Sequence, residues 1–580
     1  MAEPAASVPR VLQSGHHEAL SAQGQQLLGV YGPYRSNNDL LHYTLTVRAD
    51  PATGTLRGDN QVRFRMLEDG SRIQLDLAGE LAVDKVIFRG KAADVTRQEE
   101  SFFIDLPETL HKGETATVDV FYSGKPRTAG RFGGISFEKD ASGKPWIFTA
   151  CEGNGARVWW PNKDQWRDEP DEGIDLHVQA PNGLMDVSNG RLIAHKDLHD
   201  GFTEWHWRVT YPINNYDVAL NIANYTHWSD KPLGKLPIDF YSKPEDVSRA
   251  RTQFAQARPM LEIFNQKVGE YAFVRDGYKL VQVPYSGMEH QSAVAYGNGF
   301  ANGYGRPNNR DWTGVGISPK FDFIIIHESG HEWFGNAVTA ADPADMWIHE
   351  GFTTYMEDVY VEGMWGKPEA IRYVNGYKGK VKNLKPIVRE RGTGHEPDDE
   401  DQYFKGTLFL NTLRSVVDND AKWWATLHGF YETFKYKTIL TDDVVQYWNA
   451  ELGRDYTPIF NEYLHHAELP ELQLQFDEAA GTVRYRWQAE EPGFAMPIKA
   501  GDPQHWMSLH PTAEWQTTRG SRADFMVATE LYYVAVSRDG VREPLFTPPA
   551  VRDAAASRGG SVSAPALTIQ HGSDPGAVQQ

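Results

Sequence analysis

Cysteine, positive charge and long apolar runs are all scarce in this sequence, and each shortage excludes something. The 580 residues contain one cysteine, so no internal disulfide framework can hold the chain together. Acidic residues outnumber basic ones by 78 to 58, and the formal charge of -20 argues against nucleic acid or an anionic membrane as a partner. No apolar run approaches the roughly eighteen residues that cross a bilayer, so we expect no membrane span.

Composition and length otherwise describe a soluble globular protein of two to four domains, with 40% hydrophobic and 23% charged residues. The first ten residues, MAEPAASVPR, lack a basic segment followed by an apolar one, so we expect no signal peptide. A single cysteine fits either the cytosol or the periplasm, and the compartment stays open.

The stretch from Phe323 to Asp358 contains the strongest chemical signal. His327, Glu328 and His331 form an H-E-x-x-H, and on a helix two histidines four residues apart share one face. Both imidazoles can then bind one metal ion. Ser318 and Pro319 fit an N-cap and a first helical position, which predicts a buried helix starting near Pro319.

A catalytic zinc ion takes three protein ligands and leaves a fourth position for water. Glu350 is the best candidate for the third ligand, because the eighteen residues after His331 allow a turn and a second helix alongside the first. Glu328 lies about 100° round the helix from the histidines, which suits a general base rather than a ligand. Glu357, seven residues after Glu350, either accepts a hydrogen bond from a ligand histidine or is an exposed helical charge.

Four motifs, in this order along the chain, resemble those of the gluzincin zinc aminopeptidases, the family of alanyl aminopeptidase N and leukotriene hydrolase. The motifs are SGMEH at 286–290, HESGHEWFGN at 327–336, WIHEGFTTYMED at 347–358 and YFKG at 403–406. The likeness extends from about residue 35 to about residue 540. It implies one zinc ion per chain and peptide substrates with a free N-terminus.

The resemblance also implies how substrate is held. Glu289 and Glu152 match positions that grip the substrate's α-ammonium, and Met288 would line the pocket for the first side chain. The structural alternatives are a solvated edge-strand carboxylate for Glu289, a loop ion pair with Arg157 for Glu152, and core filling for Met288.

The match is incomplete beside these residues. Ser286 and His290 replace the glycine and asparagine of the family pattern, and Ala150 stands where the family often has glutamine. These changes alter the hydrogen-bonding groups around both glutamates. Tyr403 matches the tyrosine that stabilises the developing oxyanion, although a tyrosine at a helix start can also serve packing alone.

Hydrophobic periodicity predicts a multidomain α+β chain. We expect a flexible arm over residues 1–30, a β domain over 31–230, a catalytic domain over 231–468, a small β sandwich over 469–548 and a disordered tail over 549–580. The resemblance implies a saddle-like form for the N-terminal β domain and a thermolysin-like α/β form for the catalytic domain.

The function predicted from these residues is zinc-dependent removal of the N-terminal residue from peptides. Three alternatives remain: a zinc endopeptidase, which needs no ammonium anchor; an epoxide hydrolase of the leukotriene type; and a binding module that has lost catalysis. Comparing the cleavage of a free-amine substrate with that of its acetylated form distinguishes an aminopeptidase from an endopeptidase.

Overall fold

The computed structural model describes residues 20–127, 130–305, 309–394 and 397–546. The predicted tail and the first nineteen residues of the predicted arm lie outside these ranges. Residues that we assigned to the end of the arm form a helix, α1 (Ala22–Gly29), whose N-cap Ser21 accepts a hydrogen bond from the Gly24 amide. The short helix α2 (Pro33–Ser36) follows, and Arg35 in it is fully buried and ion-paired with Asp76 at 2.6 Å.

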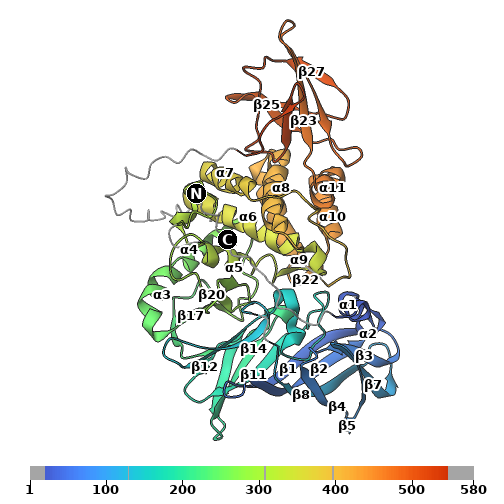
Figure 1. Ribbon diagram of the computed structural model, residues 1–580, viewed down its shortest axis with the longest axis vertical. Helices are drawn as coiled ribbons and strands as arrows, with labels where there is room; N and C mark the ends of the chain where they lie inside the picture. The colour runs from blue at the N-terminus through green and yellow to red at the C-terminus, as the bar shows by residue number, and fades with distance from the viewer. Residues whose placement is uncertain (1–19, 128–129, 306–308, 395–396, 547–580) are drawn as a thin grey trace, which may run out of the picture. The chain divides into compact units, whose positions relative to one another are not determined.

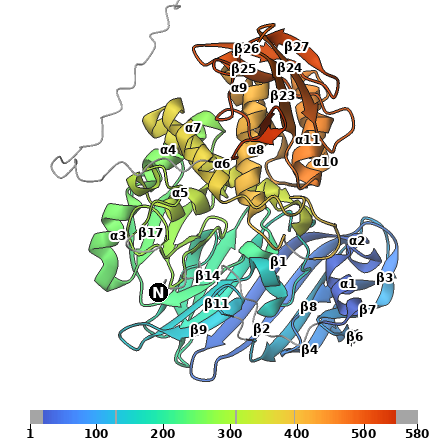
Figure 2. The same ribbon diagram turned by 45° about the horizontal axis from the view of Figure 1, so that its top comes forward.

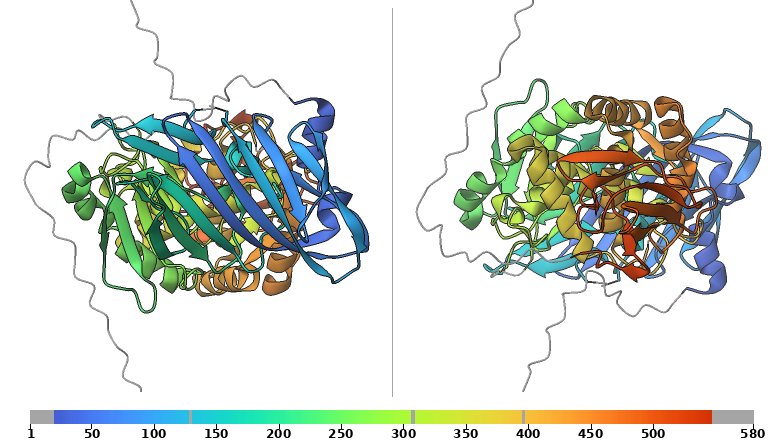
Figure 3. Two further views of the ribbon diagram at one scale, coloured as in Figure 1. Left: turned by 90° about the horizontal axis from the view of Figure 1, so that it is seen from below. Right: turned by 90° about the horizontal axis from the view of Figure 1, so that it is seen from above.

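The N-terminal region consists of β-sheets, drawn from blue to teal in Figure 1. The largest has eight strands, which lie side by side in the left view of Figure 3: β13 (Arg191–Asp197), β14 (Phe202–Val209), β11 (Ile174–Pro181), β1 (Asn38–Asp50), β2 (Thr55–Met66), β8 (Thr115–Gly124), β4 (Leu81–Phe88) and β5 (Lys91–Ala92). The alternating sequence of β1 explains why this segment forms a strand of the sheet. In YTLTV, from Tyr43 to Val47, every second side chain is buried, as expected for a sheet with one face on the core.

Two smaller sheets complete this region. One contains β3 (Gly70–Asp76), β7 (Ser101–Leu110) and β6 (Asp94–Gln98), and the other contains β12 (Met185–Asp186), β15 (Asn221–Ala223), β10 (Pro145–Ala150) and β9 (Gly134–Lys139). The end of β10 leads directly into the segment that carries Glu152.

The middle of the chain combines a mixed sheet with helices. The sheet contains β16 (Thr226–Ser229), β17 (Ile238–Ser242), β18 (Tyr278–Gln282), β20 (Val294–Tyr296) and β19 (Gly287–Met288), which is an edge strand, and β21 (Val338–Ala340) pairs separately with β22 (Lys437–Ile439). The helices are α3 (Val247–Phe254), α4 (Ala257–Lys267), α5 (Phe323–Gly330), α6 (Trp347–Trp365), α7 (Lys367–Gly376), α8 (Asp401–Val417), α9 (Asp420–Phe434), α10 (Thr441–Leu452) and α11 (Thr457–His465). Helix α6 packs against α5, α7 and α8, as Figure 2 shows, and residues 347–361 of α6 are all buried.

Two sheets form the C-terminal region. One contains β27 (Gln516–Arg519), β24 (Thr482–Gln488), β23 (Glu471–Asp477), β29 (Ala535–Arg538) and β30 (Val541–Arg542), and the other contains β26 (His505–Leu509), β25 (Ile498–Asp502) and β28 (Met526–Val527). Their buried side chains join one apolar core with those of the helical region, while most of the N-terminal sheets have a core of their own. The α+β class and the order of β, α/β and β regions are therefore confirmed. The domain boundaries remain predictions.

Among the described residues, no helix has the length and apolar character needed to cross a membrane.

Candidate active site

Helix α5, which carries the H-E-x-x-H, begins at Phe323 rather than near Pro319. Residues Ser318–Lys320 form a separate 3-10 turn, and the extended residue Asp322 caps α5 by accepting hydrogen bonds from the amides of Ile324 and Ile325. The prediction of Ser318 as the N-cap was wrong: aspartate and serine cap helices about equally well, and it is the side chain of Asp322 that lies next to the first free amides of α5. Tyr296 donates a 2.7 Å hydrogen bond to Asp322 and fixes the start of the helix.

The structure brings the three predicted metal ligands together. Oε2 of Glu350, in the first turn of α6, lies 3.4 Å from Nε2 of His327 and 3.3 Å from Nε2 of His331. All three residues are buried. The two helices thus place two imidazoles and one distant carboxylate around one point.

These separations fit a zinc ion. Zinc bonds of about 2.0–2.1 Å at tetrahedral angles place neighbouring ligand atoms about 3.3 Å apart. Moreover, Oε2 of Glu350 is buried and accepts no hydrogen bond from a described residue, an expensive arrangement that a cation would relieve. Burial alone raises the pKa of Glu350, but His331 and His327 in their protonated forms hold that pKa well below its usual range. A bound cation would take the place of their Nε2 protons in keeping the carboxylate ionised.

Hydrogen bonds to the far side of each imidazole set its orientation. Nδ1 of His327 lies 2.7 Å from Oε1 of Glu357, and Nδ1 of His331 lies 3.0 Å from the backbone oxygen of Phe334. With protons on both Nδ1 atoms, each Nε2 presents a lone pair toward Glu350. The structure therefore decides between the two interpretations of Glu357, which is fully buried behind His327.

Two tyrosines hold Glu357 in turn, and the sequence analysis did not identify them. Tyr373 donates a 2.6 Å hydrogen bond to Oε2 of Glu357, and Tyr377 donates to the same atom. The spacing of Tyr373 and Tyr377, four residues or about one helical turn, is the sequence feature that could have identified them as a pair on one face.

Glu328 lies beside the metal ligands but is not part of the ligand cluster. One of its carboxylate oxygens, one of Glu289 and a ring nitrogen of His331 all lie within 4.8 Å of one another. Burial raises the pKa of Glu328 above its usual range, and the nearby carboxylate of Glu289 acts in the same direction. A carboxylate with a raised pKa is better matched to proton transfer near neutral pH than an exposed one.

The two predicted ammonium-binding glutamates also meet. Carboxylate oxygens of Glu152 and Glu289 and a ring nitrogen of His349 lie within 4.8 Å of one another. Glu289 is 3% exposed and accepts a 3.2 Å hydrogen bond from Tyr216, while Asn336 donates to its backbone oxygen at 2.7 Å. The interpretation of Glu289 as a solvated edge carboxylate is therefore wrong.

The loop ion pair considered for Glu152 is also absent from the described contacts. Arg157 bonds instead to Glu100 at 2.6 Å and to Asp164 at 2.8 Å. Glu152 lies in a 3-10 turn that follows β10, and one of its carboxylate oxygens lies within 4.8 Å of one of Glu289.

Residues that depart from the family pattern line the same region. His290 is fully buried, and burial lowers its pKa to about 3, so its ring is neutral. Ala150 is buried at the end of β10 and offers no polar side chain there. Tyr216 and Asn336 supply hydrogen bonds to Glu289 that the sequence analysis did not assign.

His349 and Trp166 form a wall beside the glutamates that the sequence analysis also missed. Their rings stack with centroids 5.1 Å apart, and Nε2 of His349 accepts a 2.8 Å hydrogen bond from the backbone amide of Ala340. Burial lowers the pKa of His349 to about 3, so this wall is uncharged. His349 lies inside the motif WIHEGF, next to Glu350, but a single histidine there carried no distinctive signal.

Tyr403 and Met288 both lie close to the predicted site residues. Tyr403 lies in the first turn of α8, half-buried, with its ring 6.0 Å from that of His327. Met288 is 4% exposed in β19, next to Glu289, and belongs to the apolar core. Their roles in catalysis and specificity remain predictions.

Two histidines one turn apart at the end of α5, a glutamate from α6 and the buried Glu328 beside them have the arrangement of a gluzincin-type metal site. Two family models match the chain: the peptidase family M1 domain over residues 256–463, and the peptidase M1 N-terminal domain over residues 40–216. The chain belongs to peptidase family M1.

Individual relatives agree with this assignment. Endoplasmic reticulum aminopeptidase 1 of Rattus norvegicus is 23% identical over 440 residues, which cover 71% of this chain and 45% of that protein, and the Homo sapiens protein is 23% identical over 434 residues, covering 70% and 44%. The chain thus spans less than half the length of these relatives. Among solved structures, the M1 zinc metallopeptidase of Deinococcus radiodurans has a TM-score of 0.61 at 21% identity, covering 75% of this chain and 95% of that one. A mutant of that enzyme bound to a Tyr-Ser-Ala substrate has a TM-score of 0.62 at 21% identity, covering 76% and 98%.

Proposed function

We propose that this protein is a zinc-dependent aminopeptidase that removes the N-terminal residue from peptides. The observation that carries the proposal is the distance between the ammonium-binding carboxylate and the metal site. A carboxylate oxygen of Glu289 lies within 4.8 Å of both Glu328 and a ring nitrogen of the ligand His331.

That distance determines which peptide bond can be cut. A peptide's α-amino group has a pKa of about 7.7–8.0 and is largely cationic at neutral pH, so buried carboxylates bind it by charge-assisted hydrogen bonds. An ammonium held at Glu289 and Glu152 leaves room for only one residue before the metal site. A neutral amide from the middle of a peptide would leave the buried carboxylate of Glu289 beside the metal site without a cation, which disfavours an endopeptidase.

The roles of the other residues follow from their positions. His327, His331 and Glu350 would hold the zinc ion, which when bound polarises the scissile carbonyl and lowers the pKa of water. Glu328 accepts a proton from the attacking water and later delivers it to the leaving amine. Tyr403 donates its hydroxyl hydrogen to the oxyanion that develops on the carbonyl oxygen.

The relatives named aminopeptidases support the same reaction. Two carboxylates at the cleft suit an ammonium better than the epoxide of a lipid, so a leukotriene-type hydrolase is not favoured. A binding module without catalysis would not need a buried Glu328 beside a complete ligand set.

The proposal is tested by hydrolysis of a dipeptide amide with a free amine and of its N-acetylated form. We expect the free-amine substrate to be cleaved about a hundredfold or more faster in kcat/KM, because acetylation removes a charge-assisted contact at two carboxylates. Equal rates for the two substrates would refute the exopeptidase assignment. The Glu289→Gln variant serves as an internal check, because its preference for the free amine should shrink.

A further inference from the structure

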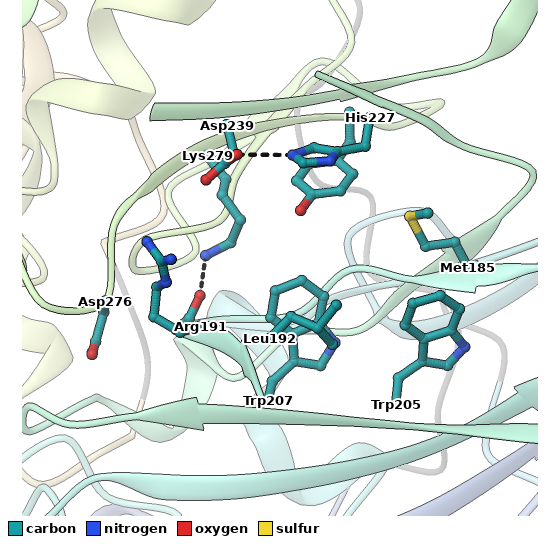
Figure 4. Close-up of a pocket in the computed structure, with 11 residues that line it drawn as sticks. Met185, Arg191, Leu192, Trp205, Trp207, His227, Asp239, Asp276 and Lys279 are labelled. Atoms are coloured by element: carbon teal, nitrogen blue, oxygen red, sulfur yellow. Dashed lines mark hydrogen bonds and ion pairs between the residues drawn. The ribbon is translucent and has the colours of Figure 1, made fainter. Parts of the chain in front are cut away.

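A second hollow, separate from the metal site, lies where the N-terminal sheet meets the mixed sheet. It has a volume of about 190 Å³, room for about six water molecules, and Figure 4 shows its lining. Leu192, Trp205 and Trp207 come from β13 and β14, while Asp239 and Lys279 come from β17 and β18. None of the residues of the proposed active site lines it.

Two cations in this hollow keep unused hydrogen-bond donors. Lys279 is 3% exposed, and its ammonium donates one 2.5 Å bond, to the backbone oxygen of Gly190. An ammonium has three donors, and no described residue accepts the other two within hydrogen-bond distance. The guanidinium of Arg191 extends beside this ammonium in Figure 4 and makes no hydrogen bond or ion pair with a described side chain or backbone oxygen.

The acidic groups of the hollow are bonded elsewhere. Both oxygens of Asp276 accept hydrogen bonds from the backbone amide of Thr210, at 3.0 and 3.1 Å. Oδ1 of Asp239 accepts from His227 at 2.8 Å and from Ser229 at 2.6 Å. Oδ2 of Asp239 accepts no hydrogen bond from a described residue, so the hollow offers this one carboxylate oxygen beside the unused donors of Lys279 and Arg191.

The remaining lining is aromatic and apolar. The ammonium of Lys279 lies 5.6 Å from the ring centroid of Trp207, and Tyr241, Trp205 and Leu192 add further apolar surface. Burial lowers the pKa of Lys279 to about 8, and the carboxylates of Asp276 and Asp239 oppose that change, so the ammonium remains mostly charged at neutral pH. A buried cation with unused donors beside apolar walls is costly unless an anion completes it.

We propose that this hollow binds a small carboxylate with an apolar body. The carboxylate accepts hydrogen bonds from Lys279 and Arg191, and the apolar body lies against Trp207, Trp205 and Leu192. Because β13 and β14 belong to one sheet and β17 and β18 to another, such a ligand would join the two sheets and stabilise the folded protein. This site is independent of the proposed peptidase activity.

The probe is 3-phenylpropionate, with 3-phenylpropanamide as a matched compound that carries a neutral amide in place of the carboxylate. Binding is measured by isothermal titration calorimetry on the whole protein, and the melting temperature is measured with the same probes. We expect one molecule of 3-phenylpropionate to bind per chain with millimolar or tighter affinity and to raise the melting temperature, and no binding of 3-phenylpropanamide.

Two variants locate the binding. Arg191→Gln removes one of the two cations at an exposed position, so the fold should survive, and we expect affinity to fall about tenfold or more. Lys196→Gln removes a charge from the same exposed strand but outside the hollow, and it should bind as the wild type does. Absence of binding by the wild type, or binding of 3-phenylpropanamide with equal affinity, would overturn the proposal. So would unchanged affinity in Arg191→Gln, which would place the carboxylate elsewhere, for example at the metal site.

Discussion

Replacing Glu357 tests whether the support behind His327 matters for metal binding. Oε1 of Glu357 lies 2.7 Å from Nδ1 of His327, and Tyr373 and Tyr377 fix the carboxylate by donating to its other oxygen. Glu357→Gln keeps the size of the side chain but removes its charge, and Glu357→Ala removes the acceptor altogether. The contact is buried, so solvent cannot replace it.

The expected loss follows from the kind of bond that is removed. A hydrogen bond to a charged group contributes about 1.5–3 kcal/mol, and loss of such support behind a ligand histidine costs about tenfold to a hundredfold in metal affinity. A hundredfold corresponds to about 2.7 kcal/mol. We expect Glu357→Ala to lie near the upper end of this range and Glu357→Gln near the lower end.

Zinc affinity is measured by competition with a chelator of known affinity, and circular dichroism verifies that the variants fold. Asp358→Asn is the matched control, because Asp358 is the next residue of α6, also carries a carboxyl group, is 3% exposed, and has no hydrogen bond or ion pair to His327. Zinc affinity within about twofold of the wild type in both Glu357 variants would refute the reasoning.

Three further changes probe the rest of the account. Glu328→Gln should lower kcat by about a hundredfold or more while bound zinc stays at the wild-type level; a rate near that of the wild type would exclude Glu328 as the base. Glu289→Gln should lower kcat/KM for a free-amine substrate by about tenfold to a hundredfold and leave the acetylated substrate unaffected, whereas equal losses on both would indicate a structural role. Asp420 tests acid stability: burial raises its pKa, but hydrogen bonds from Arg414 and Lys367 outweigh burial and bring the pKa to about 2, below its usual value of 3.8. The resulting stabilisation is present above the unfolded pKa and is lost as the pH falls toward 2. Urea unfolding of Asp420→Asn should therefore show lower stability than the wild type at pH 7 and a weaker decline of stability in acid. A pH profile equal to that of the wild type would contradict this.

The metal site could be predicted from the sequence because its geometry depends on local spacing. The histidines of H-E-x-x-H need only one helical turn, and the distance in sequence to Glu350 leaves room for a second helix, so the ligand set follows from helix geometry. The start of α5 could not be predicted in the same way. Ser318 and Asp322 are both good caps, and tertiary hydrogen bonds from Tyr296, Asn298 and Gln253 to Asp322 decide which one is used.

The surroundings of the site depended on long-range contacts. Tyr216 donates to Glu289 across 73 residues of sequence, and Trp166 stacks on His349 from a different part of the chain. No periodicity or motif links such positions, because the sheets that bring them together are set by the whole fold. Arg157 is a related case: its nearness in sequence to Glu152 suggested an ion pair, but Glu100 and Asp164 occupy its guanidinium.

Bound zinc and peptidase rate, measured in the same samples during titration with a chelator, test the central claim most directly. The account predicts one zinc ion per chain at full activity, a rate that falls in proportion to the zinc removed, and recovery when zinc is returned. Purified protein that contains no metal and yet cleaves free-amine peptides at the full rate would contradict it.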